Sequence, residues 1–197
     1  VTGLVNPKDV KKNNVTQCGD VLILTKPLGV GLTLNALRMN DCSKEMQERV
    51  FKSMTTLNKY ACDVLKKYDV HALTDVTGFG LLVHLNEMLD EKNSAVIYKD
   101  SIPYFDDCQK YVEEFYLSGA AQTNRNSVEG KISFDCDFFT EEILFDPQTS
   151  GGLLASVSKA DLEMLEKDFK ENNLELYVVG EVIEKNEYNV YVRGRKI

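Results

Sequence analysis

The chain carries the run Phe145-Asp146-Pro147-Gln148-Thr149-Ser150-Gly151-Gly152-Leu153-Leu154 between two apolar stretches. An apolar strand tip meets a proline turn, a loop of hydroxyl side chains and paired glycines follows, and apolar residues then resume. Paired glycines let a backbone approach a ligand closely and turn successive N–H groups toward an anion. The run therefore predicts a loop between two strands that could bind an oxyanion. A tight turn without a ligand is the alternative.

A second loop of the same character has the sequence Leu73-Thr74-Asp75-Val76-Thr77-Gly78-Phe79-Gly80-Leu81. Asp75 stands between a predicted strand and a predicted helix, where the functional groups of α/β units commonly lie. A carboxylate is a natural ligand for a hard divalent cation, and Gly78 and Gly80 would let the backbone bend sharply under a phosphate. Spacing alone favours a second interpretation, in which Asp75 or Thr77 caps the helix.

Apolar periodicity predicts short strands and amphipathic helices around these loops. Residues 43–68 show one apolar stripe and Ser43 as an N-cap, so we expect a long helix. The wholly apolar run Val21–Leu24 is typical of a strand covered on both faces. Further helices are expected over 31–39, 79–89, 104–117 and 158–170, and further strands over 70–74, 95–98, 132–134, 143–145 and 153–157, with a closing antiparallel pair 174–183 and 189–192. The pattern indicates an α/β fold of the α+β type, a mixed β-sheet packed with helices.

Composition narrows the classes of function. A chain of 197 residues, 43% hydrophobic and 27% charged, is typical of an ordinary globular protein with one domain or two small ones. A formal net charge of -8 argues against nucleic acid or an anionic membrane as partner. No apolar run approaches the roughly 20 residues that span a bilayer. Five dispersed cysteines without a CxxC pair predict reduced, mostly buried thiols in a cytoplasmic protein.

One polar segment and two histidines are further candidates for a functional role. Thr123-Asn124-Arg125-Asn126 is predicted as a polar loop whose arginine could pair with phosphate, although a solvated loop is the simpler interpretation. His84 is expected to be half-buried and bonded to backbone, and His71 has no cysteine or histidine partner nearby in the sequence. Neither histidine is assigned to catalysis.

The two loops, at residues 74–81 and 146–154, resemble the signature segments of selenophosphate synthetase (selenide, water dikinase). Three further stretches fit the same family in the same order: Thr2–Val5, Gly19–Gly29 with its Thr-Lys-Pro-Leu-Gly ending, and Val179–Val182. The resemblance spans nearly the whole chain. It is a resemblance to the C-terminal half of that family, within the aminoimidazole ribonucleotide synthetase-like superfamily.

The resemblance implies a fold, a reaction and a division of the chain. Residues 20–197 would be the C-terminal domain, with a mixed sheet and helices packed against it. Residues 1–19 would be a linker or edge segment from a missing N-terminal domain. The full-length homodimer would convert ATP, selenide and water to selenophosphate, AMP and phosphate, with Mg²⁺ as cofactor and the N-terminal domain as partner. We expect no nucleic-acid or membrane partner and a cytoplasmic location.

The resemblance also implies roles for residues. Asp75 would hold Mg²⁺ against the phosphates. For this loop the resemblance therefore favours the metal-ligand interpretation over the helix cap. The remaining nucleotide- and phosphate-binding residues would be Thr77, Gly78, Gly80, Gln148, Thr149, Ser150, Gly151 and Gly152. The family's glycine-rich segment, with its reactive cysteine or selenocysteine and its lysine, has no counterpart in these residues. We therefore expect no catalytic residue in this fragment and no turnover by it alone.

Two rival functions remain open at this point. One is a superfamily relative with another phosphoryl acceptor, against which the Thr-Lys-Pro-Leu-Gly match counts. The other is a catalytically silent paralogue that keeps this domain for assembly or regulation. The sequence upstream separates the silent paralogue from an active enzyme, because the reactive residue would be replaced in the former.

Overall fold

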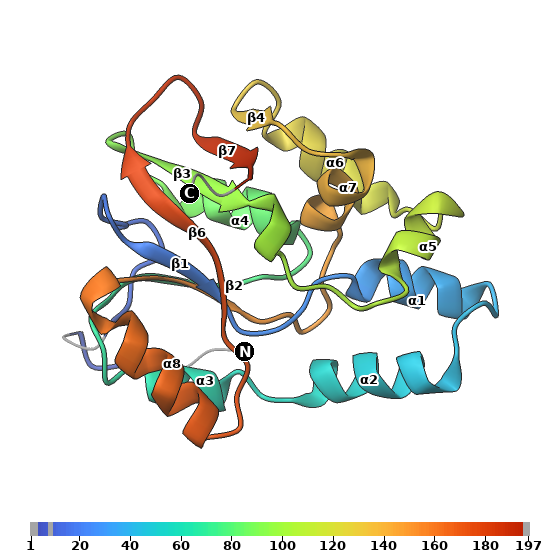
Figure 1. The fold of residues 1–197 in the computed structure, drawn as a ribbon, viewed down its shortest axis with the longest axis horizontal. Helices are drawn as coiled ribbons and strands as arrows, with labels where there is room; N and C mark the ends of the chain where they lie inside the picture. The colour runs from blue at the N-terminus through green and yellow to red at the C-terminus, as the bar shows by residue number, and fades with distance from the viewer. Residues whose placement is uncertain (1–3, 8–9, 195–197) are drawn as a thin grey trace.

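Seven strands form one mixed sheet in the computed structural model, which describes residues 4–7 and 10–194 (Figure 1). The strand order is β2-β5-β1-β6-β3-β7-β4. The strands are β1 (Val21–Leu24), β2 (Val70–Asp75), β3 (Asn93–Tyr98), β4 (Ile132–Phe134), β5 (Leu153–Val157), β6 (Tyr177–Glu184) and β7 (Val190–Arg193). Neighbouring strands are antiparallel except for β3–β7 and β4–β7, which are parallel. The predicted mixed sheet is confirmed.

Helices cover both faces of this sheet. They are α1 (Val30–Arg38), α2 (Lys44–Thr55), α3 (Lys59–Leu65), α4 (Gly80–Met88), α5 (Cys108–Glu113), α6 (Gly119–Ser127), α7 (Phe138–Phe145) and α8 (Leu162–Glu171). In Figure 1, α3 and α8 lie together on one side of the sheet, while α4, α6 and α7 lie on the other. Short 3-10 turns occupy Lys99–Ser101 and Lys159–Asp161.

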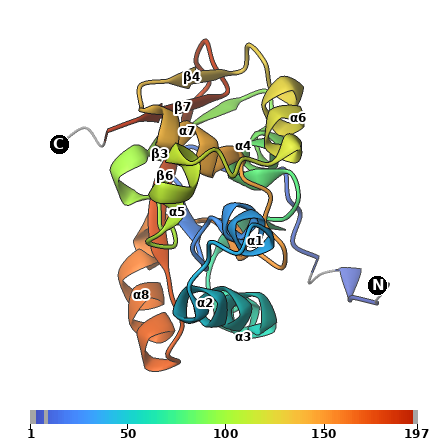
Figure 2. The same ribbon diagram turned by 90° about the vertical axis from the view of Figure 1, so that its right-hand side faces the viewer.

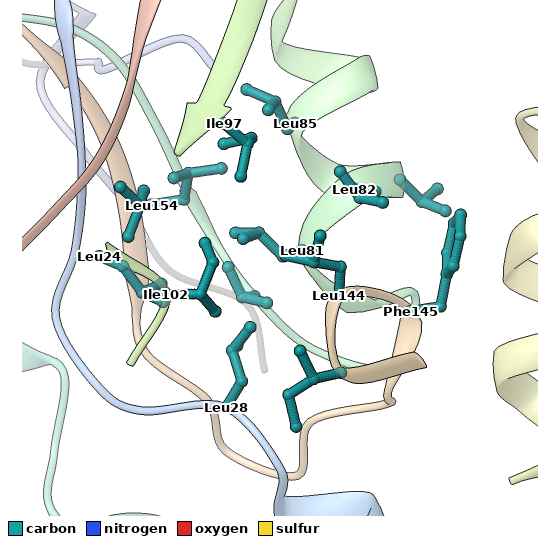
Figure 3. Close-up of a cluster of buried hydrophobic side chains, with 14 of the residues drawn as sticks. Leu24, Leu28, Leu81, Leu82, Leu85, Ile97, Ile102, Leu144, Phe145 and Leu154 are labelled. Carbon is teal, nitrogen blue, oxygen red and sulfur yellow. The ribbon is translucent and has the colours of Figure 1, made fainter. Parts of the chain in front are cut away.

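Strand β1 is buried on both faces, as its apolar run predicts. Leu22 and Leu24 belong to the larger core, with residues of α1, α4 and α7, whereas Val21 and Ile23 pack in a second core with α3 and α8. Figure 3 shows Leu24 within the larger core, beside Leu154 of β5. Because a fully buried aliphatic side chain stabilises a fold by about 1.5–3 kcal/mol, four such residues on one strand fix its place in the sheet.

The predicted helix over 43–68 is wrong in one respect, because it is two helices. Ser43 is the N-cap of α2, its hydroxyl accepting from Met46 N at 3.1 Å, but α2 ends at Thr55 and α3 begins only at Lys59. Thr56 between them is extended, with φ −70° and ψ 121°, and its hydroxyl bonds back to Lys52 O. A threonine hydroxyl that competes for a helix carbonyl favours the end of a helix over its interior.

Two other predicted elements are also wrong. Residues 143–145 are not a strand but the last turn of α7, whose N-cap is Asp137. A short apolar run fits a buried strand and a buried helix equally well, so its periodicity could not decide. The helix expected over 104–117 is limited to α5, because Tyr104 is held in an isolated bridge to Leu28.

The predicted closing pair is wrong because β3 lies between β6 and β7. Every residue of β3 is buried, so placing it in the middle of the sheet removes more apolar surface from water than a local hairpin would. The approach of β3 to β6 is close at one point, where a Cβ on Gly180 would lie 2.1 Å from Val96 O.

The segment before β1 runs along the edge of the sheet. Thr2 and Gly3 of the first matching stretch lie outside the described residues. Further along, Lys12 O accepts from Leu73 N at 3.1 Å, so this segment runs beside the edge strand β2.

Of the helices in the described ranges, none is long and apolar enough to cross a bilayer.

We predict that Gly180→Ala destabilises the protein by about 2–3 kcal/mol, because its methyl group would overlap Val96 O in the middle of the sheet. Urea unfolding followed by circular dichroism measures the change. Gly119→Ala is the matched control, since a Cβ there meets nothing within 4 Å. Equal stability of the two variants would contradict the close β3–β6 approach.

Candidate functional site

The two glycine-containing loops predicted from the sequence lie side by side at one end of the sheet. Asp75, the last residue of β2, is the register partner of Leu153, the first residue of β5. Beyond the strands, Val76 N donates to Gly152 O at 2.8 Å and Gln148 N donates to Thr77 O at 3.0 Å. The structure therefore brings the 75–80 loop and the 148–152 loop together.

Asp75 presents a free carboxylate at this junction. The residue is exposed, and its side chain makes no hydrogen bond or ion pair with any described residue. Helix α4 begins after Phe79 with no side-chain cap, so neither Asp75 nor Thr77 serves as the cap that spacing left open. An exposed carboxylate with no partner in the described part of the chain is available to a cation.

The donor set for a metal ion is small. Within residues 4–7 and 10–194, no group of three or more His, Cys, Asp or Glu side chains is arranged around a common point. Mg²⁺ usually keeps several waters and takes one or two protein carboxylates together with substrate phosphates. The single carboxylate of Asp75 fits such a shared ion and does not fit an all-protein metal cage.

The 149–152 loop presents consecutive backbone amides. None of the N–H groups from Thr149 to Gly152 has an acceptor in the described part of the chain. Ser150 adopts a left-handed backbone conformation, with φ 52°, and Thr149 and Ser150 are exposed, whereas Gly151 and Gly152 are buried. Successive amides around a left-handed residue form a concave donor surface that binds anions.

Gln148 is placed differently from its loop neighbours, because its side chain is buried and satisfied by the protein. Its amide oxygen accepts from Val30 N at 3.3 Å, and its amide nitrogen donates to Asp146 Oδ2 at 2.9 Å. Asp146 Oδ2 also accepts from Gly31 N at 2.9 Å. The two side chains thus satisfy the first amides of α1 and position the loop rather than face a ligand.

Burial gives Asp146 an unusual protonation behaviour. Only 2% of the residue is exposed, and its Oδ1 atom has no hydrogen-bond partner. This desolvation raises the pKa of Asp146 to about 7, although the donors from Gly31 and Gln148 lower it. The carboxyl group therefore titrates near neutral pH.

The 77–80 segment is fixed from beneath by buried groups. Gly80 has φ +70°, and a Cβ there would lie 2.8 Å from Phe145 O, so a larger residue does not fit. Thr77 Oγ1 lies 3.2 Å from His84 Nε2. His84 is buried but bonds to this side chain and not to backbone, which corrects the expectation.

Sequence reasoning missed Asn124, which joins the two halves of the site. Its buried side-chain amide donates to Gly78 O at 3.0 Å and to Phe145 O at 3.1 Å. Residues 123–126 are part of helix α6, so the predicted polar loop is wrong. Arg125 pairs with Glu141 at 2.9 Å and with Glu142, and therefore lacks the freedom expected of a phosphate ligand.

The cysteines and His71 show no catalytic arrangement among the described residues. All five cysteines are free thiols, but only Cys108 is buried, so the expectation of mostly buried thiols is wrong. Burial raises the pKa of the Cys108 thiol, which keeps it protonated. His71 Nδ1 lies 2.8 Å from Asp20 Oδ1, inside a network that also includes Ser156.

Known proteins of similar sequence and fold give an independent view. A family model described as AIR synthase related protein, C-terminal domain, matches residues 17–193. A protein of Agathobacter rectalis named selenide, water dikinase is 43% identical over 194 residues, which are 98% of this chain and 57% of that protein. The chain thus spans little more than half the length of this curated relative.

Solved structures agree on the fold. The thiamine-monophosphate kinase of Stenotrophomonas maltophilia matches with a TM-score of 0.67 at 16% identity, over 98% of this chain and 56% of that one. AaThiL, complexed with AMPPCP and TMP, matches with a TM-score of 0.55 at 17% identity, over 93% and 50%. At such low identity these two likenesses show the fold alone.

We predict that the free energy of unfolding falls as pH rises toward neutrality, because of the titration of Asp146. Its pKa is about 7 when folded against an ordinary 3.8, so between these values the folded state binds more protons. Its stabilising effect is complete below about pH 4 and is lost as pH rises through 7, by up to about 1.4 kcal/mol per pH unit.

Urea unfolding at pH 5, 6, 7 and 8 tests this dependence. Asp146→Asn, which keeps the shape but not the charge, should flatten the slope. Asp168→Asn on α8 is the control, because the partners of that carboxyl lower its pKa and its titration lies below this range. An unchanged slope in Asp146→Asn would exclude Asp146 as the titrating group.

Proposed function

The chain belongs to the AIR synthase related protein family, C-terminal domain, and on this premise we propose that it is the C-terminal part of a selenide, water dikinase. The full-length enzyme would convert ATP, selenide and water to selenophosphate, AMP and phosphate. Identity of 43% to a protein of that name across nearly all of this chain supports the choice of reaction. AaThiL, which shares this fold, is complexed with AMPPCP in its solved structure.

The observation that carries the proposal is the juxtaposition at the end of the sheet. A free, exposed carboxylate on Asp75 lies beside a loop whose amides from Thr149 to Gly152 lack acceptors in the described ranges. Phosphoryl transfer needs both kinds of group, since a metal ion neutralises phosphate charge and oriented N–H donors hold phosphate oxygens. One loop supplies the metal ligand and the other supplies the donors.

Each residue of the site then has a role toward a magnesium nucleotide. Asp75 would hold Mg²⁺, which neutralises charge on the phosphates when bound. Ser150 and its neighbours would donate backbone N–H groups to phosphate oxygens. Thr77, Gly78 and Gly80 shape the first loop, and Gln148 orients the second through its bonds to Val30 and Asp146.

The remaining parts of the proposal concern the whole protein. Residues 1–19 would lead from an N-terminal domain that supplies the reactive cysteine or selenocysteine, its lysine and further metal ligands. The working enzyme would be a cytoplasmic homodimer. A single carboxylate and one amide loop are an incomplete set for a magnesium nucleotide, which is consistent with a site shared between two domains.

In the full-length protein, we predict that Asp75→Asn lowers selenide-dependent AMP formation from magnesium-ATP by at least ~100-fold, because it removes a charged metal ligand. Asp69→Asn, just before the other end of β2, is the matched control and should keep the wild-type rate. Loss of rate in Asp75→Asn alone would support both the reaction and the role of this residue.

Other outcomes of that assay separate the parts of the proposal. Undiminished AMP formation by Asp75→Asn would contradict the metal-ligand role and leave the reaction intact. Absence of selenide-dependent AMP from a well-folded wild type would contradict the reaction, and would favour a silent paralogue or a relative with another phosphoryl acceptor.

A further prediction concerns these 197 residues alone. With one carboxylate and one amide loop, the isolated chain should bind magnesium-ATP with a Kd weaker than about 1 mM, which is about −4 kcal/mol. It should release no AMP. Isothermal titration calorimetry and an AMP assay test this, and substantial nucleotide-dependent AMP release by the isolated chain would contradict the proposed division of the site.

A further inference from the structure

A cleft of about 590 Å³ lies beside the end of β1, at a place that the proposed function does not use. Its wall is formed on one side by α2, which Figures 1 and 2 show below α1, and on the other by the 103–106 and 173–177 segments. The volume is within the range of small-molecule sites, roughly 300–1,000 Å³. We call it the basic cleft, after the side chains of Lys26, Arg49 and Lys52 that line it.

Three cations line the cleft together with two carboxylates, Asp106 and Glu175, although the chain carries a net charge of -8. Arg49 and Lys52 are three residues apart on α2, so they share one face of that helix, and Thr56 follows directly after its end. Arg49 pairs with exposed Asp106 at 2.6 Å, whereas Lys52 has no ion-pair partner among the residues described. At least one cation of the cleft is therefore free to meet an anion.

Lys26 forms the floor of the basic cleft and is only 7% exposed. Its ammonium donates to Thr56 O at 2.8 Å and to Ser150 O at 2.9 Å, and no described residue accepts its third proton. A buried ammonium is disfavoured by desolvation, which lowers the pKa of Lys26. An anion in the cleft would offset that cost and take the remaining proton.

Asn58 adds a hydrogen-bond acceptor to the cleft, whereas the lysine side chains are donors. Its amide nitrogen donates to Gly151 O at 2.9 Å, but its buried Oδ1 has no partner. A buried acceptor without a donor costs about 1–3 kcal/mol, so a ligand hydroxyl at this position would be favoured. Tyr104 and Tyr177, also in the lining, offer ring surface to the body of the ligand.

We propose that the basic cleft binds a hydroxyl-bearing phosphate ester of the size of a sugar phosphate. Lys26 and Lys52 would contact the phosphate, and Asn58 Oδ1 would accept from a hydroxyl. The cations outnumber the two carboxylates of the lining and favour an anion, the unpaired acceptor favours a donor, and the volume accommodates both on one small molecule. The lining includes neither Asp75 nor Thr149, so the cleft is distinct from the proposed metal-nucleotide site, although Lys26 and Asn58 contact the backbone of the adjacent amide loop.

Amide NMR titration of the 197-residue chain with ribose 5-phosphate tests the proposal. Ribose and inorganic phosphate, titrated separately, show which part of the ligand is recognised. We expect a Kd of about 0.1–1 mM for ribose 5-phosphate, with shifts at the amides of Lys52, Asn58 and Tyr177. Each separate component should bind at least ~10-fold more weakly.

Two substitutions should move this affinity in opposite directions. Lys52→Gln removes the unpaired cation and should weaken binding by ~5-fold or more, whereas Asp106→Asn releases Arg49 and should tighten binding. Lys44→Gln, at the other end of α2, is the control and should have no effect. All three positions are exposed, so the variants should fold.

Three results would overturn the proposal. They are the absence of shifts in the basic cleft at 20-fold the expected Kd, equal binding by wild type and Lys52→Gln, and shifts confined to Thr149–Gly152. The last result would support the amide loop of the dikinase site while excluding the cleft. Asp75→Asn should leave binding of ribose 5-phosphate unchanged, which separates failure of this proposal from failure of the proposed function.

Discussion

The geometry of the candidate site depends on one set of buried hydrogen bonds at the end of the sheet. Thr25 N donates to Leu153 O at 3.1 Å, and Leu153 N donates to Thr25 Oγ1 at 2.8 Å. One residue further along, Gly152 O accepts from Val76 N. Each bond contributes only about 1 kcal/mol, but an unpaired buried partner would cost more, so the three segments hold one another in place. The loops that follow are therefore positioned before any ligand arrives.

Glycines in these loops serve this close packing more than they serve flexibility. A Cβ on Gly151 would lie 2.1 Å from Val76 O, and one on Gly31, in the adjacent first turn of α1, would lie 2.4 Å from Asp146 Oδ1. Both contacts are far below van der Waals distance, so a larger residue would separate segments that the hydrogen bonds require to touch. Only Gly78, with open space around it, has no such constraint.

Sequence patterns predicted the parts of the fold that short-range chemistry decides. The apolar run at Val21–Leu24 and the Ser43 cap were sufficient, because burial on both faces and N-capping act within a few residues. Order in the sheet was not predictable in this way, since β3 enters between β6 and β7 through contacts distant in the chain. In the candidate site, residue type singled out Asp75 and the 148–152 loop, but only the resemblance favoured a metal ligand over a helix cap at Asp75. Asn124 was missed because its importance lies in reaching Gly78 O and Phe145 O from a helix that the sequence did not reveal.

Lys26 connects the amide loop to the basic cleft, and this connection has a thermodynamic consequence. Its ammonium donates to Ser150 O, in the loop proposed for phosphate, while lining the cleft on the other side. An anion in the cleft would draw on the same ammonium that orients Ser150, so occupancy of the cleft would change the free energy of the loop conformation. Any coupling between two such ligands must be reciprocal. Because the shared group is one buried side chain and not a mobile domain, that coupling would act through the strength of the Lys26–Ser150 hydrogen bond, without rearrangement of the sheet.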